Sequence, residues 1–396
     1  MSERYPKPIV DFLKGEPTPE QWTAISWPLE PSVVVAGAGS GKTSVMAARV
    51  IYLAMVATGA WPAEHEGVMP GNVFCLTFTN KATENLILKM RRALRTLDLD
   101  EGEEPEISNY HAFAAQVLER HGMLIGLEPG QRVLSQAQRA EIAARVLDRM
   151  TFETLHTRWQ PAIVGYILGL DEQLQNHLVE PETVVEHVEG KLDALRKARS
   201  AEPLLAAEER VEIARAVRVF RDIKAELGVI DFGDQIAHAV RIASEFPDVG
   251  RAYRDRFGAV LLDEYQDTNH AQAVLMRAVF GAGHPVTAVG DPDQNIYAWR
   301  GASLWNLLHF RKEFPLSDGS ESAQLPLYTN FRSGARILQA ADKVIDALPA
   351  NQRPDPDKLL RPWERNGDGR VEVARYEHEV AEAEGVAERA LALHAN

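Results

Sequence analysis

The 396-residue sequence lacks features that would place it in several large classes of protein. It has one cysteine, Cys75, so no internal disulfide can form, and the apolar neighbours of this residue favour a small buried side chain. No apolar run is long enough to cross a bilayer, and the first residues lack the apolar core of a signal peptide. We therefore expect a cytoplasmic protein that does not contact a membrane.

The sequence also lacks an excess of positive charge. Its formal net charge is −14, which argues against a histone-like coating of nucleic acid. A nucleic-acid-binding protein of this composition must rely on a local basic groove and on aromatic side chains that stack on bases. No internal repeat is present, and the length predicts one to three ordinary globular domains.

Four short apolar runs, rich in β-branched residues, each end in a polar or glycine-rich cluster and precede a helix-like stretch. The runs are residues 33–35, 73–76, 260–262 and 286–289, and the clusters that follow them are residues 37–43, 77–81, 263–268 and 290–300. This alternation predicts an α/β protein with a parallel sheet. Because ligands bind beyond the carboxyl ends of such strands, we expect the four clusters to meet at one edge.

The character of the chain changes twice along its length. Strand-like runs vanish after residue 111, and Ala, Leu, Glu and Arg dominate, which predicts a helical insertion. The last part contains a helix-like stretch and a strand candidate at residues 369–374, as expected for the start of a second α/β domain. The predicted organisation is two parts of one α/β domain at 1–111 and 225–324, a helical insertion at 112–224, and an incomplete second domain at 325–396.

A glycine-rich cluster between a strand and a helix has the pattern of a phosphate-binding P-loop. Its residues are Ala36, Gly37, Ala38, Gly39, Ser40, Gly41, Lys42 and Thr43, with Ala36 where the pattern usually has glycine. Glycines allow backbone N–H groups to surround a phosphate, and the helix N-terminus adds partial positive charge. Lys42 would reach the β- and γ-phosphates, and Thr43 would ligate Mg²⁺. A glycine-rich turn without a ligand is the alternative, which the order of strand, loop and helix disfavours.

Two adjacent carboxylates, Asp263 and Glu264, follow the buried run 260–262. Asp263 is suited to hold Mg²⁺ directly or through water, and Glu264 is suited to polarise the water that attacks a γ-phosphate. By itself such a pair can simply start a helix, since Asp is a good helix cap. Beside a P-loop, the pair indicates a site for ATP and Mg²⁺.

Longer segments resemble the UvrD/Rep/PcrA branch of superfamily-one DNA helicases. They are residues 77–82 (TFTNKA), 231–234 (DFGD), 263–268 (DEYQDT), 290–302 (GDPDQNIYAWRGA) and 330–333 (NFRS), in the family's order from Gln21 to Ser333. The resemblance implies a P-loop NTPase of RecA-like fold with a helical insertion, followed by the start of a second RecA-like domain. It also implies an ATP-dependent 3′-to-5′ helicase or translocase that acts on single-stranded and 3′-tailed duplex DNA in repair, replication or recombination.

The resemblance assigns further roles at the nucleotide. Gln21 is similar to the residue that reads the edge of adenine, and Gln294 to the one that senses the γ-phosphate and couples it to DNA. Arg332 resembles an arginine that reaches the γ-phosphate from the second motor domain. Phe331 stands where the family usually has a tyrosine stacked on adenine, and Ser44 where it usually has an arginine. For Gln21 and Arg332, an ordinary surface role is the alternative.

The resemblance also implies a track for single-stranded DNA, formed by Phe78, Asn80, Tyr110, His111, Tyr297, Trp299 and Arg300. Each base stacked on an aromatic ring contributes about 1–3 kcal/mol without sequence preference. Phe78 can alternatively belong to the core, because it directly follows a strand. Basic residues on the following helix, between residues 89 and 95, form a phosphate track or a solvated helix face equally well.

Neither the remaining DNA-coupling segment nor the arginine finger of the family's second motor domain is present after Ser333. We therefore expect the chain to be truncated, with missing domains or a partner subunit completing it, and to be inactive in unwinding by itself. The alternative is a non-motor fragment, or a subunit of a larger helicase–nuclease, that binds nucleotide and single-stranded DNA. A P-loop kinase for small molecules does not account for the segments at 263–268 and 290–302.

Overall fold

The computed structural model describes residues 4–97, 103–155, 158–198, 201–281, 283–349 and 358–395. The chain divides into two compact units, and the boundary in the sequence lies between Leu327 and Tyr328. None of the helices in the described ranges is both long and apolar enough to cross a membrane.

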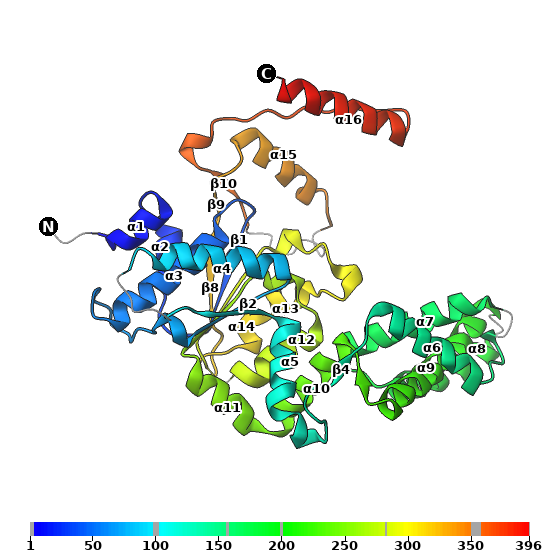
Figure 1. The fold of residues 1–396 in the computed structure, drawn as a ribbon. Helices are drawn as coiled ribbons and strands as arrows, with labels where there is room; N and C mark the ends of the chain where they lie inside the picture. The colour runs from blue at the N-terminus through cyan, green and yellow to red at the C-terminus, as the bar shows by residue number, and fades with distance from the viewer. Residues whose placement is uncertain are drawn as a thin grey trace. The chain divides into compact units, whose positions relative to one another are not determined.

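A six-stranded parallel sheet forms the centre of the first unit (Figure 1). Its strand order is β3-β2-β6-β7-β1-β8, with bounds β1 Ser32–Ala36, β2 Val73–Thr77, β3 Glu106–Asn109, β6 Ala259–Leu262, β7 Val286–Gly290 and β8 Ala323–Leu327. The four strands predicted from apolar runs are confirmed, and every residue in them is buried. Because all six strands are parallel, their carboxyl ends share one edge.

Helices cover both faces of the sheet, as its fully buried strands require. On one face Cys75 packs in a core that includes Ile9, Ile25, Met46 and Leu86, from the helices α1 Lys7–Leu13, α2 Pro19–Ile25, α3 Lys42–Ala57 and α4 Asn80–Leu94. On the other face Phe74 contacts Phe113, Phe257 and Phe280, with ring centroids 5.0, 4.9 and 6.0 Å away. The helices of that layer are α5 Tyr110–His121, α10 Phe232–Glu245, α11 Pro247–Arg256 and α12 His270–Phe280.

A helical bundle is inserted between α5 and α10 (Figure 1). Its helices are α6 Gln136–Arg149, α7 Gln160–His177, α8 Pro181–Lys197 and α9 Ala201–Glu226, and at its base β4 Arg132–Val133 pairs with β5 Val229–Ile230. The bundle has its own core, in which Val146, Ile167 and Phe220 are fully buried. The bundle begins later than the predicted residue 112, because α5 packs against the sheet through Phe113.

Shorter elements complete the first unit. They are α13 Leu304–Leu308 and α14 Phe310–Glu313, with 3-10 turns η1 Pro70–Asn72, η2 Gly122–Ile125, η4 Tyr265–Asp267, η5 Pro292–Gln294 and η6 Ala298–Arg300.

The second unit contains a two-stranded parallel sheet of β9 Thr329–Asn330 and β10 Arg361–Pro362, with helices α15 Ala335–Asp346 and α16 Glu379–His394 and the 3-10 turn η8 Glu364–Asn366. Its predicted start at residue 325 lies inside β8, because residues 323–327 pair with β1. The prediction of a strand at 369–374 is wrong. Val371 and Val373 are 46% and 94% exposed, and no described strand lies alongside to cover them.

Candidate functional site

The loop after β1 has the backbone shape that a bound phosphate requires. Gly39 and Gly41 adopt left-handed conformations, with φ of 75° and 87°, where a side chain would be strained. The Gly37 N–H donates to the Leu327 carbonyl at 3.2 Å, which fixes the loop to the end of β8. The hydroxyl of Ser40 is buried and has no hydrogen-bond partner among the described residues. This arrangement offers backbone N–H groups and a polar side chain to an anionic ligand at the start of α3.

Lys42, the first residue of α3, forms an ion pair with Glu264, with 2.9 Å between Nζ and Oε2. The Lys42 side chain is 10% exposed and that of Glu264 is 34% exposed. Partial burial strengthens the attraction, because less water screens it than at the open surface. The ion pair brings the predicted phosphate-binding lysine and the predicted base together at the carboxyl edge of the sheet.

The backbone of Glu264 lies in the left-handed region, with φ of 48°, which residues other than glycine rarely adopt. Such a conformation costs on the order of 1–3 kcal/mol and persists when surrounding contacts determine it. The Glu264 N–H donates to Asp263 Oδ1 at 3.1 Å, and the Gln266 side-chain amide donates to Glu264 Oε2 at 3.0 Å. Backbone strain retained at Glu264, next to a second carboxylate, is typical of a functional turn.

Two carboxyl groups of this turn have raised pKa values. Burial, reinforced by the nearby Glu264 charge, raises the pKa of Asp263 to about 6, although the Lys42 ammonium opposes the shift. Burial and the Glu264 charge also raise the pKa of Asp267 to about 6. A crowded group of buried carboxylates gains stability from a cation. The described residues contain no cluster of three or more His, Cys, Asp or Glu side chains that could hold a metal ion by themselves.

Gln266 connects the candidate base to the segment that follows β7, and its role was not predicted from the sequence. Its amide donates to Glu264, and its side-chain oxygen accepts a hydrogen bond from the Asp291 N–H at 3.0 Å. Gln294 donates to the Asp291 carboxylate, and Asn295 donates to the Gln266 carbonyl at 2.5 Å. Gln266 is only 1% exposed, so water does not compete for these bonds.

Gln21 lies against the P-loop. Its side-chain oxygen accepts a hydrogen bond from the Thr18 N–H at 3.1 Å, in a capping box that starts α2. Its Nε2 is 3.5 Å from the Ser40 carbonyl and 3.4 Å from the position that a Cβ at Gly41 would occupy. The amide predicted to read adenine is therefore fixed beside the loop predicted to hold the phosphates.

A buried arginine, Arg49 on α3, also holds α2 in place. Burial lowers the pKa of its guanidinium to about 10, and the group donates to the carbonyls of Ala24, Ile25, Trp27 and Pro28 at 2.7–3.4 Å. These acceptors lie at the end of α2 and just after it. Sequence reasoning missed this residue, because its apolar helical neighbours resemble any core helix.

Aromatic side chains gather beyond the ends of β2 and β7. Phe78 stacks on Tyr297 with ring centroids 5.5 Å apart, and Tyr297 lies 6.4 Å from Trp299. The Arg300 guanidinium lies over both the Trp299 ring at 4.6 Å and the Tyr297 ring at 5.4 Å. Trp299 is 74% exposed, which leaves a large ring face open to a ligand. The structure thus brings four of the predicted DNA-contacting residues together.

The remaining predicted DNA contacts lie beyond β2 and β3 and differ in exposure. The His111 and Phe232 rings are in contact, with centroids 5.6 Å apart, and Phe232 is 55% exposed. Phe232 is a candidate DNA contact that sequence reasoning missed. Asn80 is exposed and accepts a hydrogen bond from the Asn109 side chain at 2.6 Å. Tyr110, in contrast, is only 1% exposed because it turns into the core at the start of α5. We therefore remove Tyr110 from the candidate DNA surface.

The basic residues of α4 do not form one uncompensated track. Arg91 pairs with Glu104 at 3.1 Å, and burial lowers the pKa of Lys89. The exposed Arg91–Glu104 pair fits a solvated helix face, whereas Lys89 is partly buried and fits neither interpretation.

In the second unit, Phe331 and Arg332 follow β9. The Phe331 ring contacts Trp363 at 5.3 Å, and the Arg332 N–H donates to the Asn330 side chain at 2.8 Å. Arg332 itself is exposed.

Comparison with known sequences decides the family. Residues 17–315 match the UvrD/REP helicase N-terminal domain. The chain belongs to the UvrD/REP helicase family. This confirms the resemblance seen in the motifs, and the matched range runs from α2 to α14 and includes every strand of the sheet except β8.

Several UvrD/REP relatives are similar over most of this chain. The ATP-dependent DNA helicase UvrD1 of Mycobacterium tuberculosis is 32% identical over 98% of the chain and 46% of its own length. The ATP-dependent DNA helicases PcrA of Leuconostoc citreum and Bacillus subtilis are 30% and 28% identical, over 91% and 95% of the chain and 42% and 45% of their own lengths. The chain thus spans a little under half the length of these curated relatives.

Proposed function

We propose that this chain is the ATP- and single-stranded-DNA-binding part of an ATP-dependent DNA helicase that moves 3′ to 5′. One observation carries the proposal. The Lys42–Glu264 ion pair is connected through Gln266 to Asp291, at the start of the segment that holds Tyr297 and Trp299. A hydrolytic site hydrogen-bonded to an exposed aromatic surface is what a motor needs in order to couple ATP to a DNA strand.

At the nucleotide, backbone N–H groups of residues 37–41 and the Lys42 ammonium bind the phosphates, and the Gln21 amide lies where it can contact the base. Thr43 and Asp263 would hold Mg²⁺, which when bound neutralises charge on the phosphate oxygens. Glu264 orients and deprotonates the attacking water. The hydrogen bond from Gln266 holds the Glu264 side chain in place.

Further assignments at the nucleotide rest on family resemblance. Gln294 senses the γ-phosphate and is already hydrogen-bonded to Asp291. Arg332, from the second unit, stabilises charge on the γ-phosphate, and Phe331 supplies a ring for adenine.

At the DNA, bases stack on Phe78, Tyr297, Trp299 and Phe232, while Arg300 takes a phosphate. This mode of binding is independent of base sequence. It weakens with salt, because phosphates bound by cations release their counterions. The acidic net charge of the chain is compatible with this mode, since stacking needs no general positive coat.

ATP hydrolysis with and without oligo-dT tests the proposal. We expect ATP binding, single-stranded-DNA binding and weak but DNA-stimulated hydrolysis, because the second unit has only a two-stranded sheet in its described residues. Hydrolysis that does not respond to DNA, despite binding of both ligands, would favour the non-motor binding module. Phosphate transfer to a small molecule would favour a kinase.

Strand displacement tests polarity. Duplexes with a 3′ or a 5′ single-stranded tail are incubated with this chain and with a chain extended to the full length of its relatives. We expect displacement only by the extended chain and only with the 3′ tail. Displacement by the 396-residue chain would show that the described second unit suffices for a motor stroke.

A further inference from the structure

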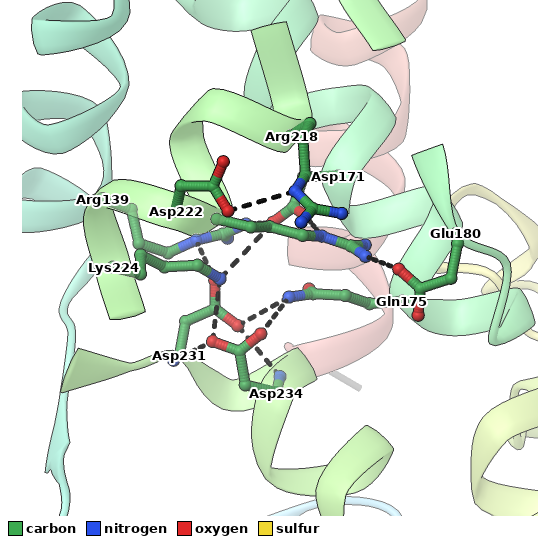
Figure 2. Close-up of polar contacts among 10 residues, drawn as sticks. Arg139, Asp171, Gln175, Glu180, Arg218, Asp222, Lys224, Asp231 and Asp234 are labelled. Atoms are coloured by element: carbon green, nitrogen blue, oxygen red, sulfur yellow. Dashed lines mark hydrogen bonds and ion pairs between the residues drawn. The ribbon is translucent and has the colours of Figure 1, made fainter. Parts of the chain in front are cut away.

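A cluster of six charged side chains, three of them buried and three partly buried, lies where the helical bundle meets the start of α10 (Figure 2). The charges of its three cations and three carboxylates cancel. The six residues are Arg139, Arg221, Lys224, Asp171, Asp231 and Asp234. Lys224 is at the centre: its Nζ lies 2.9 Å from Asp231, 2.8 Å from Asp234 and 3.9 Å from Asp171. We call these six residues the ion cluster.

The ion cluster is buried enough for its charges to depend on one another. Asp171 is fully buried, Asp231 is 1% exposed and Lys224 is 3% exposed. Burial by itself would raise the pKa of Asp231, but the Lys224 and Arg139 charges outweigh it and lower that pKa to about 2. Burial lowers the pKa of Lys224, and the three carboxylates more than reverse this effect and raise it. Loss of one member therefore leaves an uncompensated buried charge.

The ion cluster ties the end of α7 to the beginning of α10. Asp231 caps α10, and its side chain accepts a hydrogen bond from the Asp234 N–H at 3.0 Å. Gln175 on α7 donates through Nε2 to Asp231 Oδ1 at 3.0 Å and to Asp234 Oδ1 at 2.9 Å (Figure 2). Gly233 permits this approach, because a Cβ there would lie 1.9 Å from Gln175 Oε1.

Both helix ends continue directly into the candidate DNA surface. Phe232, whose exposed ring contacts His111, directly follows Asp231 of the ion cluster in the sequence. Asn176, the neighbour of Gln175, accepts a hydrogen bond from Asn269 at 2.7 Å. Asn176 also packs against Gly301: a Cβ at position 301 would lie 2.6 Å from the Nδ2 of Asn176. Gly301 directly follows the Trp299–Arg300 pair.

We propose that Lys224 and Gln175 are positioning residues for single-stranded DNA. They bind Asp231 and Asp234, on either side of Phe232, and Gln175 is the neighbour of Asn176, which lies beside Gly301 at the end of the Trp299–Arg300 pair. The inference rests on the proposed DNA-binding function. It gives the helical bundle a role, since the bundle then sets the spacing between two aromatic contacts that the sheet alone does not connect. The nucleotide site contains no member of the ion cluster.

The test replaces Lys224 with methionine, which has similar length and no charge. We expect the affinity of Lys224→Met for oligo-dT to fall roughly tenfold or more, since three carboxylates, two of them buried, then face two cations. Gln175→Met removes two hydrogen bonds without changing charge, and we expect a smaller loss of about threefold to tenfold. Affinity for a fluorescent ATP analogue should stay within about twofold in both variants, since additivity holds for distant sites. Lys224→Arg should restore part of the DNA affinity.

Arg218→Met provides a matched control on the same helix. Arg218 is 57% exposed and pairs with Glu182 and Asp222 at the surface, so its loss should leave DNA affinity unchanged. A double-mutant cycle separates positioning from general loosening. If Lys224 acts through Phe232, then Phe232→Ala costs much less affinity in the Lys224→Met background than alone.

The outcomes are distinct. Full DNA affinity in both Lys224→Met and Gln175→Met overturns the inference while leaving the proposed function intact. Additive losses in the cycle also overturn it, because they show that Phe232 is not the element positioned. If Lys224→Met loses its helical circular dichroism, Gln175→Met alone decides. Failure of the unmodified chain to bind oligo-dT would instead refute the proposed function.

Discussion

The Lys42 ammonium lies 2.9 Å from the Glu264 carboxylate, although the strands that precede them, β1 and β6, are separated by β7. The ion pair thus crosses the end of an intervening strand. We expect a triphosphate at the P-loop to compete with Glu264 for Lys42, which would leave the carboxylate available to a water molecule. Phosphate binding and activation of the base are then connected events.

Lys42→Ala should abolish measurable binding of a fluorescent ATP analogue. The variant removes the cation from a loop whose backbone N–H groups alone bind phosphate weakly. Circular dichroism should be unchanged, because Lys42 is not a core residue. Lys81→Ala, which removes an exposed lysine paired at 3.8 Å with Glu84, serves as the control and should bind normally. Equal affinity in the two variants would remove the P-loop assignment.

Glu264→Gln should preserve ATP affinity and lower DNA-stimulated phosphate release by at least about 10²-fold, the range of general-base catalysis. The amide keeps an oxygen that can accept from Gln266, so the turn should retain its conformation. Hydrolysis close to the unmodified rate would assign the base to another residue. Asp267, three positions along, is the nearest candidate.

Trp299→Ala should weaken binding of oligo-dT and of mixed-sequence DNA equally, by about 1–3 kcal/mol. The chain offers a close control in Trp159→Ala, since Trp159 is 76% exposed and Trp299 is 74% exposed. Trp159 precedes α7 in the helical bundle. Titration by fluorescence anisotropy at two salt concentrations measures both variants. Comparable losses of DNA affinity in the Trp299→Ala and Trp159→Ala variants would show that DNA does not bind preferentially at Trp299.

Asp263→Asn should stabilise the nucleotide-free chain above about pH 6. The folded state raises the pKa of Asp263 from 3.8 to about 6, so the folded state binds more protons than the unfolded state between these values. Stability from this group is therefore full below about pH 4 and is lost as the pH rises to about 6. Two pKa units correspond to roughly 3 kcal/mol at pH 7, which Asn would recover.

Urea unfolding at pH 4.5 and pH 7.5 measures this effect. The gain from Asp263→Asn should be small at the lower pH and larger at the higher one, while Mg²⁺-dependent ATP binding is lost at both. A gain that does not depend on pH would mean that it does not come from ionisation of the Asp263 carboxyl.

Gln266→Met should uncouple the nucleotide site from DNA. The two hydrogen bonds of its side chain are the direct connection between Glu264 and Asp291, and coupling free energies of this kind are about 1–3 kcal/mol. The ratio of ATP hydrolysis with and without oligo-dT should fall about fivefold or more. DNA affinity without nucleotide should remain that of the unmodified chain. An unchanged ratio would exclude this route of coupling.

Sequence reasoning recovered the parts of the fold that depend on local pattern. Buried β-branched runs predicted β1, β2, β6 and β7, and the glycine spacing predicted the loop before α3. It missed β3, whose four residues include only one apolar side chain, Ile107. It wrongly predicted a strand at 369–374, because alternation of Val and Glu indicates a strand only where a neighbouring element covers the valines.

The site was less predictable than the sheet, because several of its contacts join residues far apart in the sequence. Tyr110 and His111 are adjacent, yet the first is buried and the second contacts an exposed ring. Gln266 lies within a recognised segment, but its partner Asp291 is set by the pairing of β6 with β7. The ion cluster joins positions from 139 to 234, and no spacing rule connects charges across four helices.

The buried position of Cys75 determines the chemistry of the only thiol in the chain. Burial raises the pKa of this thiol, and the Asp263 charge adds to the effect, so the reactive thiolate is scarcely formed. Maleimide dyes and mild oxidants should therefore leave the folded chain unmodified. A cysteine introduced on the surface, for instance by Lys191→Cys on α8, would be the single labelled position, and native Cys75 would need no replacement before fluorescence experiments.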